Sequence, residues 1–205
     1  MNSGSRWRCK RPGRYGRIGM ALDNVFHKHF LREISPERSD IFHTKFFTES
    51  FCYIIYQLFK DQKEWTDKDF AYSTHDIQLA DKFPDLYEII KERIDDLILP
   101  TMSKIWSLDH SVEAGDIFVV KYSDDTQKEL KPHIDQSYIS GSIKLNNDYV
   151  GGTLMFPRQK VFNQDIKPGD LLIWPSQITH EHYSTVLEQG EKYSITIWTD
   201  TKNNS

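Results

Sequence analysis

The sequence is poor in cysteine and has no long hydrophobic run. Its two cysteines, Cys9 and Cys52, show no CxxC spacing, which argues against a disulfide framework and against a thiolate metal site. The longest apolar runs, such as DIFVV and LLIW, are far shorter than the ~20 residues that cross a bilayer. The first residues also lack the apolar segment of a secretory signal peptide. We therefore expect a protein of a reducing compartment, the cytoplasm, without a membrane span.

The sequence as a whole also has no excess of positive charge. The formal net charge is -4 at pH 7, which excludes a generally basic nucleic-acid binder. Arginine and lysine are concentrated at the start of the chain, and we expect residues 1–20 to form a disordered basic arm. Such an arm could contact nucleic acid or an acidic partner, or it could be a solvated tail.

A hydrophobic share of 38% in 205 residues predicts one domain with a substantial core. Residues 21–110 are predicted to form the helical support region of this domain. Helical spacing predicts a helix over 21–34 and another after Thr48, its N-cap. A further helix should open at Pro84 and break or kink at Pro100. The segment IFHTKFF, with His43, could be an edge strand, and the polar stretch 64–81 is predicted to be a loop.

The hydrophobic period changes from 3.6 to 2 in residues 111–201, which we expect to form the catalytic core. Six short segments show this pattern and are separated by turn residues: DIFVVKY, ELKPHID, YISGSIKL, TLMFP, DLLIWP and KYSITIWT. Many short strands without intervening helices predict a sandwich or a barrel.

Two histidines and one carboxylate of this core could converge on one metal ion. His133 and Asp135 are two residues apart, so on a strand they share a face, and Ile134 should point into the opposite layer. The third ligand could be His180 or His182. Such a set leaves coordination positions open and is the facial triad of non-haem Fe(II) oxygenases. It could also bind Zn(II), as in hydrolases.

The order of these motifs resembles the Fe(II)/2-oxoglutarate-dependent dioxygenases, in particular the procollagen lysyl and prolyl 4-hydroxylase type. The matching segments are FVVKY, L-x-PHID, IKLNNDYVGGTLMF, PGDLLIWPSQITHEH and GEKYSITIW. The similarity extends over roughly residues 70–200. It implies an α+β fold with a mainly β core, namely a double-stranded β-helix (jelly-roll, cupin-like) supported by N-terminal helices.

The resemblance also implies the cofactor. Fe(II) would be held by His133, Asp135 and His182, because in the hydroxylase pattern the metal histidine precedes the 2-oxoglutarate-binding cation, here Lys192, by ten residues. Reaction with O2 would convert 2-oxoglutarate to succinate and CO2 while a C–H bond is hydroxylated, with ascorbate as a possible supporting reductant.

The resemblance further implies that three residues bind 2-oxoglutarate. Lys192 would pair with its distal carboxylate. Lysyl hydroxylases have an arginine at this position and prolyl 4-hydroxylases a lysine, which leaves the substrate subfamily open. Tyr122 and Ser194 would donate hydrogen bonds to the same co-substrate.

The expected substrate is a lysine or proline residue of a partner peptide or protein. Asp124, Asp125 and Glu129 could form an acidic rim that favours lysine. One alternative is the same chemistry on a small molecule or a nucleobase, which the basic arm favours slightly. A non-catalytic β-helix binding module and a zinc hydrolase are further alternatives, but neither explains Lys192.

Overall fold

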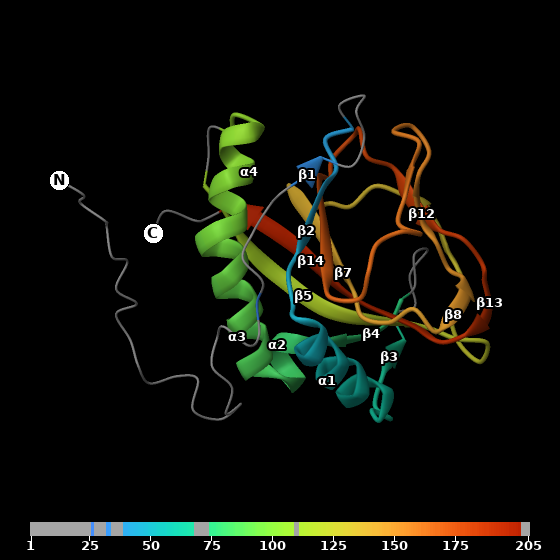
Figure 1. Ribbon diagram of the computed structural model, residues 1–205. Helices are drawn as coiled ribbons and strands as arrows, with labels where there is room; N and C mark the ends of the chain where they lie inside the picture. Colours follow the sequence, from blue (N-terminus) through green and yellow to red (C-terminus); the bar gives the residue numbers. More distant parts are fainter. Residues whose placement is uncertain (1–25, 27–31, 34–38, 68–73, 109–110, 202–205) are drawn as a thin grey trace.

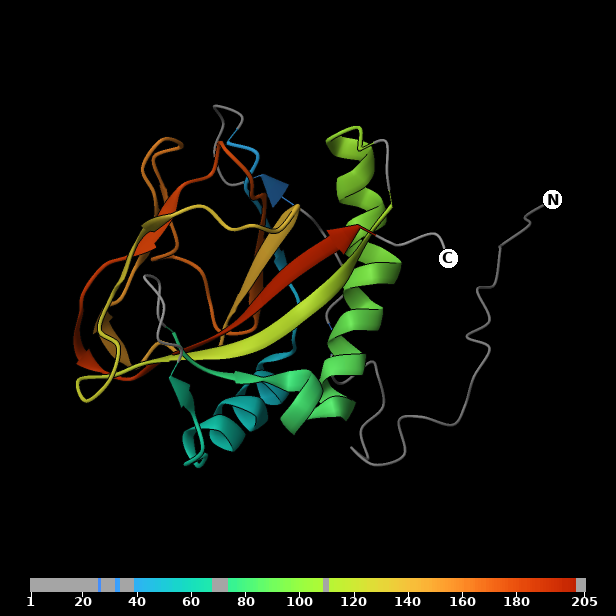
Figure 2. The ribbon, with the colours of Figure 1, turned by 180° about the vertical axis from the view of Figure 1, so that it is seen from behind.

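The computed structural model describes residues 26, 32–33, 39–67, 74–108 and 111–201. The predicted basic arm, residues 1–20, lies outside this part of the chain. A large antiparallel sheet carries helices on one side and faces a smaller sheet on the other (Figures 1 and 2). No helix of the described residues is long and apolar enough to cross a membrane.

Three sheets account for the described strands. The large sheet has the order β1 (Arg32–Glu33), β2 (Phe42–Lys45), β11 (Asp170–Pro175), β7 (Ile139–Lys144), β14 (Lys192–Thr201), β5 (Val112–Tyr122), β4 (His75–Gln78) and β3 (Thr66–Asp67). The small sheet has the order β10 (Val161–Phe162), β9 (Leu154–Phe156), β12 (His182–Ser184) and β6 (Leu130–His133). The third sheet pairs β13 (Leu187–Gly190) with β8 (Tyr149–Gly151).

The central strands of the large sheet are largely buried on both faces, and strand alternation divides their side chains between two environments. In β5, Ile117 and Val119 belong to the cluster that packs under the helices. Phe118 and Val120 point the other way and line a cavity between the sheets. The sheet therefore separates a helix-covered core from the interior of the β-helix.

The helices form the outer layer. They are α1 (Glu49–Lys60), α2 (Leu79–Lys82), α3 (Pro84–Arg93), the π-helical turn η2 (Ile94–Ile98) and α4 (Leu99–Ile105). The last three form one continuous column in Figures 1 and 2. The Leu99 N–H bonds to the Ile94 carbonyl, so the backbone widens by one residue just before Pro100, which has no N–H to contribute.

The predicted fold class is confirmed: the chain has a double-stranded β-helix core with helices packed on one outer face. The six predicted strands are present, and the Thr48 side chain caps α1 by accepting a hydrogen bond from the Phe51 N–H. Pro84 opens α3 as expected, whereas Pro100 does not break the helical column.

Several local predictions are wrong. The described residues of the predicted helix 21–34 are extended, because Phe26 bridges to Phe47 and residues 32–33 form β1. The predicted loop 64–81 contains β3, β4 and the start of α2. The strand with His43 is not at the edge, since β1 covers it. Helical spacing also predicts Ile54 and Leu58 on the apolar face of α1, but both are exposed, and Tyr56 is buried instead; Cys52 is buried, as expected of a packing residue.

Candidate active site

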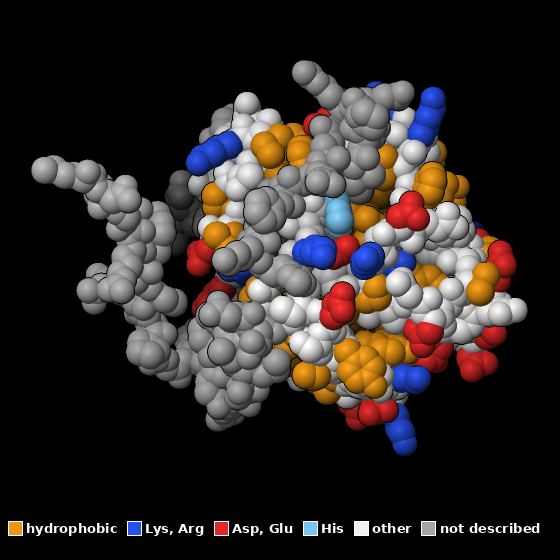
Figure 3. Space-filling view, viewed as in Figure 1, with side chains coloured by type: hydrophobic (Ala, Val, Ile, Leu, Met, Phe, Trp, Pro, Cys, Tyr) orange, Lys and Arg blue, Asp and Glu red, His pale blue; other side chains and the backbone are white. Residues whose placement is uncertain are grey.

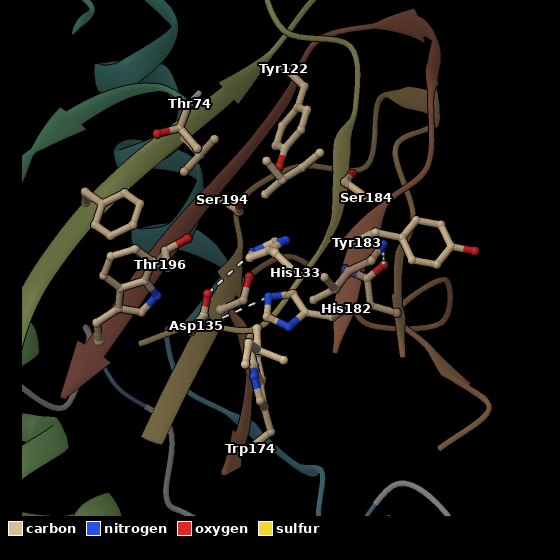
Figure 4. Close-up of a pocket in the computed structure, with 18 of the residues that line it drawn as sticks. Thr74, Tyr122, His133, Asp135, Trp174, His182, Tyr183, Ser184, Ser194 and Thr196 are labelled. Carbon is tan, nitrogen blue, oxygen red and sulfur yellow. Dashed lines mark hydrogen bonds and ion pairs between the residues drawn. The ribbon is translucent and has the colours of Figure 1, made fainter. Parts of the chain in front are cut away.

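A cavity of about 640 Å³ lies inside the β-helix, between the large and small sheets. Most of its accessible wall is apolar or aromatic, and its polar groups lie around His133, Asp135 and His182 (Figure 4) and around Lys192. A largely apolar cavity with a few placed polar groups is the usual form of a small-molecule site. His133, Asp135, His182, Lys192, Tyr122 and Ser194, which the sequence singled out, all line it.

His133, Asp135 and His182 form a compact group in this cavity. His133 ends β6, His182 begins β12, and the two are direct cross-strand partners. Asp135 follows just after β6 and lies 3.4 Å from His133 Nε2 through Oδ1 and 3.7 Å from His182 Nε2 through Oδ2. One ligand atom from each residue lies within 4.8 Å of the others. Figure 4 shows the three side chains pointing toward one another.

Backbone carbonyls fix the orientation of both imidazole rings. His133 Nδ1 donates to the Lys131 carbonyl at 2.8 Å, and His182 Nδ1 donates to the His180 carbonyl at 2.9 Å. With Nδ1 protonated, Nε2 keeps its lone pair and faces the carboxylate. Metal-binding histidines are usually oriented by a hydrogen bond of this kind.

The electrostatics of the group fit a divalent cation. Burial opposes ionisation of Asp135, yet its contacts with His133 and His182 and a hydrogen bond from Ser140 keep the pKa of its carboxyl below the usual value. Burial lowers the pKa of His182, which favours the neutral ligand form. Burial also opposes the charged form of His133, but its contact with Asp135 leaves the pKa of the imidazole above the usual value. Asp135 Oδ2 is buried without a hydrogen-bond partner, as expected of an oxygen that awaits a metal ion.

His180 does not join this group. Its Nε2 donates to the Ser39 carbonyl at 2.9 Å, and its Nδ1 accepts from the Thr179 hydroxyl at 2.8 Å. Both ring nitrogens are therefore engaged, and neither is left for a metal. His180 instead anchors the chain near Ser39 and supplies the carbonyl that orients His182.

Lys192 occupies another part of the cavity wall. Its side chain is buried, its Nζ donates to Ser184 Oγ at 3.1 Å, and it lies 4.4 Å from the centroid of the Tyr122 ring. No carboxylate of the described residues lies within ion-pair distance of Nζ. Burial, followed by the positive charge of Lys144, lowers the pKa of Lys192 to about 7. An enclosed cation of this kind has a strong affinity for a carboxylate.

Two expectations about neighbouring residues are corrected. Ile134 does not pack into an opposite layer but lines the cavity, with 47% of its side chain exposed, because β6 ends at His133. Of the proposed acidic rim, Asp124, Asp125 and Glu129, none lines the cavity. Asp124 forms an exposed ion pair with Lys128 instead.

Sequence reasoning missed four polar or aromatic residues of the site. Ser184 bonds to Lys192, and Ser140 bonds to Asp135 and accepts a hydrogen bond from Ser176 at 2.6 Å. Trp174 and Trp198 line the cavity. Ser184 stands two residues after His182, the same spacing that linked His133 to Asp135, so strand periodicity could have found it.

Residues 117–200 match the family model of the 2OG-Fe(II) oxygenase superfamily. The fold agrees: a prolyl-4-hydroxylase from Pseudomonas putida superposes with a TM-score of 0.62 at 14% identity, over 82% of this chain and 95% of that one. A Trichoplax adhaerens prolyl hydroxylase, solved with a peptide fragment of a hypoxia inducible factor oxygen degradation domain, gives 0.61 at 13% identity over 80% and 84%. Residues 117–200 therefore match the 2OG-Fe(II) oxygenases in sequence, and the fold of the chain is the same as in these enzymes.

Two curated relatives with similar sequences are procollagen-lysine dioxygenases. Human procollagen-lysine,2-oxoglutarate 5-dioxygenase 2 is 25% identical over 197 residues, which is 89% of this chain and 26% of the relative. Procollagen-lysine,2-oxoglutarate 5-dioxygenase from Drosophila melanogaster is 34% identical over 86 residues, 40% of this chain and 12% of the relative. Within the superfamily, the sequence similarity is therefore to procollagen hydroxylases. It spans about a quarter or less of the length of these relatives.

Proposed function

We propose that this chain hydroxylates a C–H bond of a peptidyl lysine or proline, using 2-oxoglutarate and O2. The observation that carries the proposal is one cavity holding both a His-Asp-His group and the buried cation Lys192. The reaction balances as 2-oxoglutarate, O2 and a C–H group giving succinate, CO2 and a C–OH group.

His133, Asp135 and His182 are proposed to hold Fe(II), which when bound supplies the activation of O2. The protein contributes geometry: two imidazoles fixed by backbone carbonyls and one carboxylate fixed by Ser140. Three ligands on one side leave the opposite side of the metal open for reactants. A zinc hydrolase would need the same three residues but has no use for Lys192.

Lys192, Tyr122 and Ser194 are proposed to hold 2-oxoglutarate. The Lys192 ammonium would pair with the distal carboxylate, while the hydroxyls of Tyr122 and Ser194 offer hydrogen bonds from the two neighbouring strands. Burial raises the pKa of Tyr122, so its hydroxyl stays protonated and can donate. The surrounding apolar residues exclude water and strengthen each polar contact.

A peptide or protein substrate is supported by the names of the relatives and by the peptide in the Trichoplax structure. A nucleic-acid substrate gains no support from the face drawn in Figure 3. On the face drawn in Figure 3, lysine and arginine side chains lie scattered among acidic ones rather than in one basic patch.

Succinate release tests the proposal without knowledge of the substrate. Wild type with Fe(II), ascorbate, 2-oxoglutarate and air should release succinate slowly, and His133→Ala, Asp135→Ala and His182→Ala should not. His180→Ala should retain metal binding. The enzymatic proposal fails when wild type neither binds Fe(II) with 2-oxoglutarate nor releases succinate. Loss of metal binding in His180→Ala but not in His182→Ala contradicts the ligand assignment.

A further inference from the structure

The surroundings of the Lys192 amine are unlike those of an ordinary lysine. Lys121, for comparison, has its Nζ 2.6 Å from a carboxylate oxygen of Glu191. Lys192 is 5% exposed, and its Nζ donates its hydrogen bond to the Ser184 hydroxyl at 3.1 Å. The Tyr122 ring, 4.4 Å away, completes the contact. A hydroxyl and a ring replace only part of the hydration that a buried ammonium loses, so this site favours the uncharged amine.

The ionisable groups around Lys192 come from three neighbouring strands, and none of those in the described ranges is acidic. They are Tyr122 on β5, Lys144 on β7 and Tyr149 on β8. Burial raises the pKa of both tyrosines, so their hydroxyls stay neutral. The charged group is Lys144. Burial, followed by this charge, lowers the pKa of Lys192 to about 7, which agrees with the lack of an acidic neighbour.

Lys144 places its positive charge on the cavity side of the large sheet. It is the cross-strand partner of Ser194, which lines the cavity, and cross-strand partners share a face. Burial lowers the pKa of Lys144, while the charges of Asp165 and Asp170 favour its ammonium form. A cation here disfavours a second ammonium on Lys192 but attracts a negative charge placed there. The surroundings therefore suit a negative group at Lys192, whether it belongs to a ligand or is attached to the amine.

The cavity offers space and hydrogen-bond donors for such a group. Lys192, Tyr122, Ser184 and Ser194 all line it, and its volume is about 640 Å³. The three hydroxyls can donate hydrogen bonds to carboxylate oxygens. A carboxylate bonded to Lys192 Nζ would occupy the place proposed above for the distal carboxylate of 2-oxoglutarate. The two groups therefore exclude each other.

We propose that Lys192 is a carbamylation site for CO2 and that its carbamate excludes 2-oxoglutarate. The lone pair of the neutral Nζ attacks the carbon of CO2, a C–N bond forms, and one electron pair of a C=O bond moves onto oxygen. The nitrogen then releases a proton to the solvent. R–NH2 and CO2 thus give R–NH–COO⁻ and H⁺, without oxidation or reduction. The competition rests on the function proposed above, which also releases CO2 in this cavity, whereas the modification itself needs only dissolved CO2.

Chemical trapping identifies the modified lysine. Metal-free protein is incubated with ¹³C-bicarbonate at about pH 8, where an ordinary lysine is still charged. Triethyloxonium then converts carbamates to stable ethyl esters, and the digested protein is analysed by mass spectrometry. The peptide with Lys192 should carry the label, whereas Lys121, held in its charged form by Glu191, should not. Addition of Zn(II) and 2-oxoglutarate before the bicarbonate should remove most of the label from Lys192.

Three variants separate the contributions. Lys192→Arg keeps a positive charge but has no amine that becomes neutral, so it should form no carbamate. Lys144→Met should lower the labelled fraction about fivefold or more, because it removes the attraction for the carbamate and raises the pKa of Lys192. Lys128→Met is the matched control, since Lys128 forms an exposed ion pair with Asp124 and does not line the cavity. It should be labelled at Lys192 like wild type.

The affinity for 2-oxoglutarate gives a second measurement, made on protein loaded with Zn(II), which has no redox chemistry. In wild type, dissolved CO2 should weaken 2-oxoglutarate binding about two- to fivefold, as a competitor at about one to four times its Kd does. In Lys192→Arg the affinity, whatever its size, should not depend on CO2. Equal weakening in both proteins would mean that the bicarbonate ion competes without modifying the lysine, and it would contradict the proposal.

The proposal is overturned when the Lys192 peptide of wild type carries no label, or when exposed lysines carry as much label as Lys192. Unchanged labelling in Lys144→Met would likewise contradict it. Failure of the proposed function looks different, because wild type then releases no succinate while Lys192 is still labelled by dissolved CO2.

Discussion

Lys192 is a cation enclosed by protein atoms, with a hydroxyl and an aromatic ring as neighbours but no acidic partner among the described residues. Its pKa falls from 10.5 to about 7 through burial and the nearby charge of Lys144. Between these values the unfolded chain binds more protons than the folded one at this site, so the stability of the ligand-free protein should rise with pH there. When a carboxylate is bound beside Lys192, the folded protein instead favours the protonated form of this lysine.

Binding of 2-oxoglutarate should therefore take up a proton above pH 7. At pH 8.5 free Lys192 is mostly neutral, whereas Lys192 paired with a carboxylate is charged, so affinity should fall as pH rises from 7. Calorimetry at pH 8.5 in two buffers with different ionisation enthalpies measures the uptake. Lys192→Met should abolish both the uptake and most of the affinity. A binding heat independent of the buffer would show that Lys192 is already charged.

Substitution of Gly152 tests how closely the backbone must approach Lys192. Its φ is +58°, and an added Cβ would lie 3.2 Å from Lys192 Cδ. We expect Gly152→Ala to lose about 1–2 kcal/mol of stability through the left-handed backbone and to weaken 2-oxoglutarate about tenfold by displacing the lysine. Gly169→Ala is the control, since Gly169 also has positive φ (+89°) but contacts Phe47 and Cys52. It should lose stability and keep 2-oxoglutarate affinity in an equilibrium binding assay.

Single residues of the site could be predicted where a fixed spacing along a strand places two side chains on the same face. His133 and Asp135 were predicted from strand periodicity, although the strand ends at His133 and Asp135 lies in the loop that follows. Trp174 and Trp198 were not predictable, because an aromatic residue in a strand is as typical of a core as of a site. Only the three-dimensional register shows that both flank Ser140.

At the level of elements, the acidic side chain of Asp95 links the π-helical turn η2 to the sheet, beside the buried Ile94 and Ile98. Asp95 accepts the Ala114 N–H at 2.7 Å and pairs with Lys91 at 3.0 Å, and Lys91 also lies 3.3 Å from Glu113. These contacts join the helical column to the start of β5.

Removing this carboxylate should loosen that junction. Asp95→Ala should cost about 1.5–3 kcal/mol, since it leaves the Ala114 N–H without its acceptor and removes one of the two acidic partners of Lys91. The exposed neighbour Asp96→Ala should change stability by less than about 0.5 kcal/mol. Denaturant unfolding of both variants measures the difference. Equal stabilities would mean that the junction is held by apolar packing alone.

Helices and strands were predicted well where local sequence signals determine them. They were predicted poorly where pairing with another strand determines them. The cap at Thr48 and the proline at Pro84 define helix starts without tertiary information. Residues 64–81 look like a loop because they are polar, yet His75–Gln78 becomes β4 by pairing with β5. Short strands of this kind gain their stability from the neighbouring strand, which a single sequence does not reveal.

For the whole molecule, the metal group joins separate parts of the chain, since β6 and β12 are about 50 residues apart in sequence. A metal ion that binds only the folded state should stabilise the entire β-helix. At a concentration 100 times the Kd it adds about 2.7 kcal/mol, or roughly 5–10 °C in Tm for a domain of this size.

Thermal unfolding with and without Mn(II) or Zn(II) measures this shift. Wild type and His180→Ala should both show it, each relative to its own metal-free protein, whereas Asp135→Ala and His182→Ala should not. A full shift in Asp135→Ala would place the metal elsewhere on the protein.

Strand β14 carries Lys192 at its buried beginning and Trp198 six residues later, on the same face. A molecule that entered the cavity from the half-buried Trp198 end would pass the group of His133, Asp135 and His182 before it reached Lys192. A peptide bound beside that group would close the path behind the co-substrate. Loading would then be compulsory in order, 2-oxoglutarate before peptide, and the exit of succinate would have to wait for the peptide to leave.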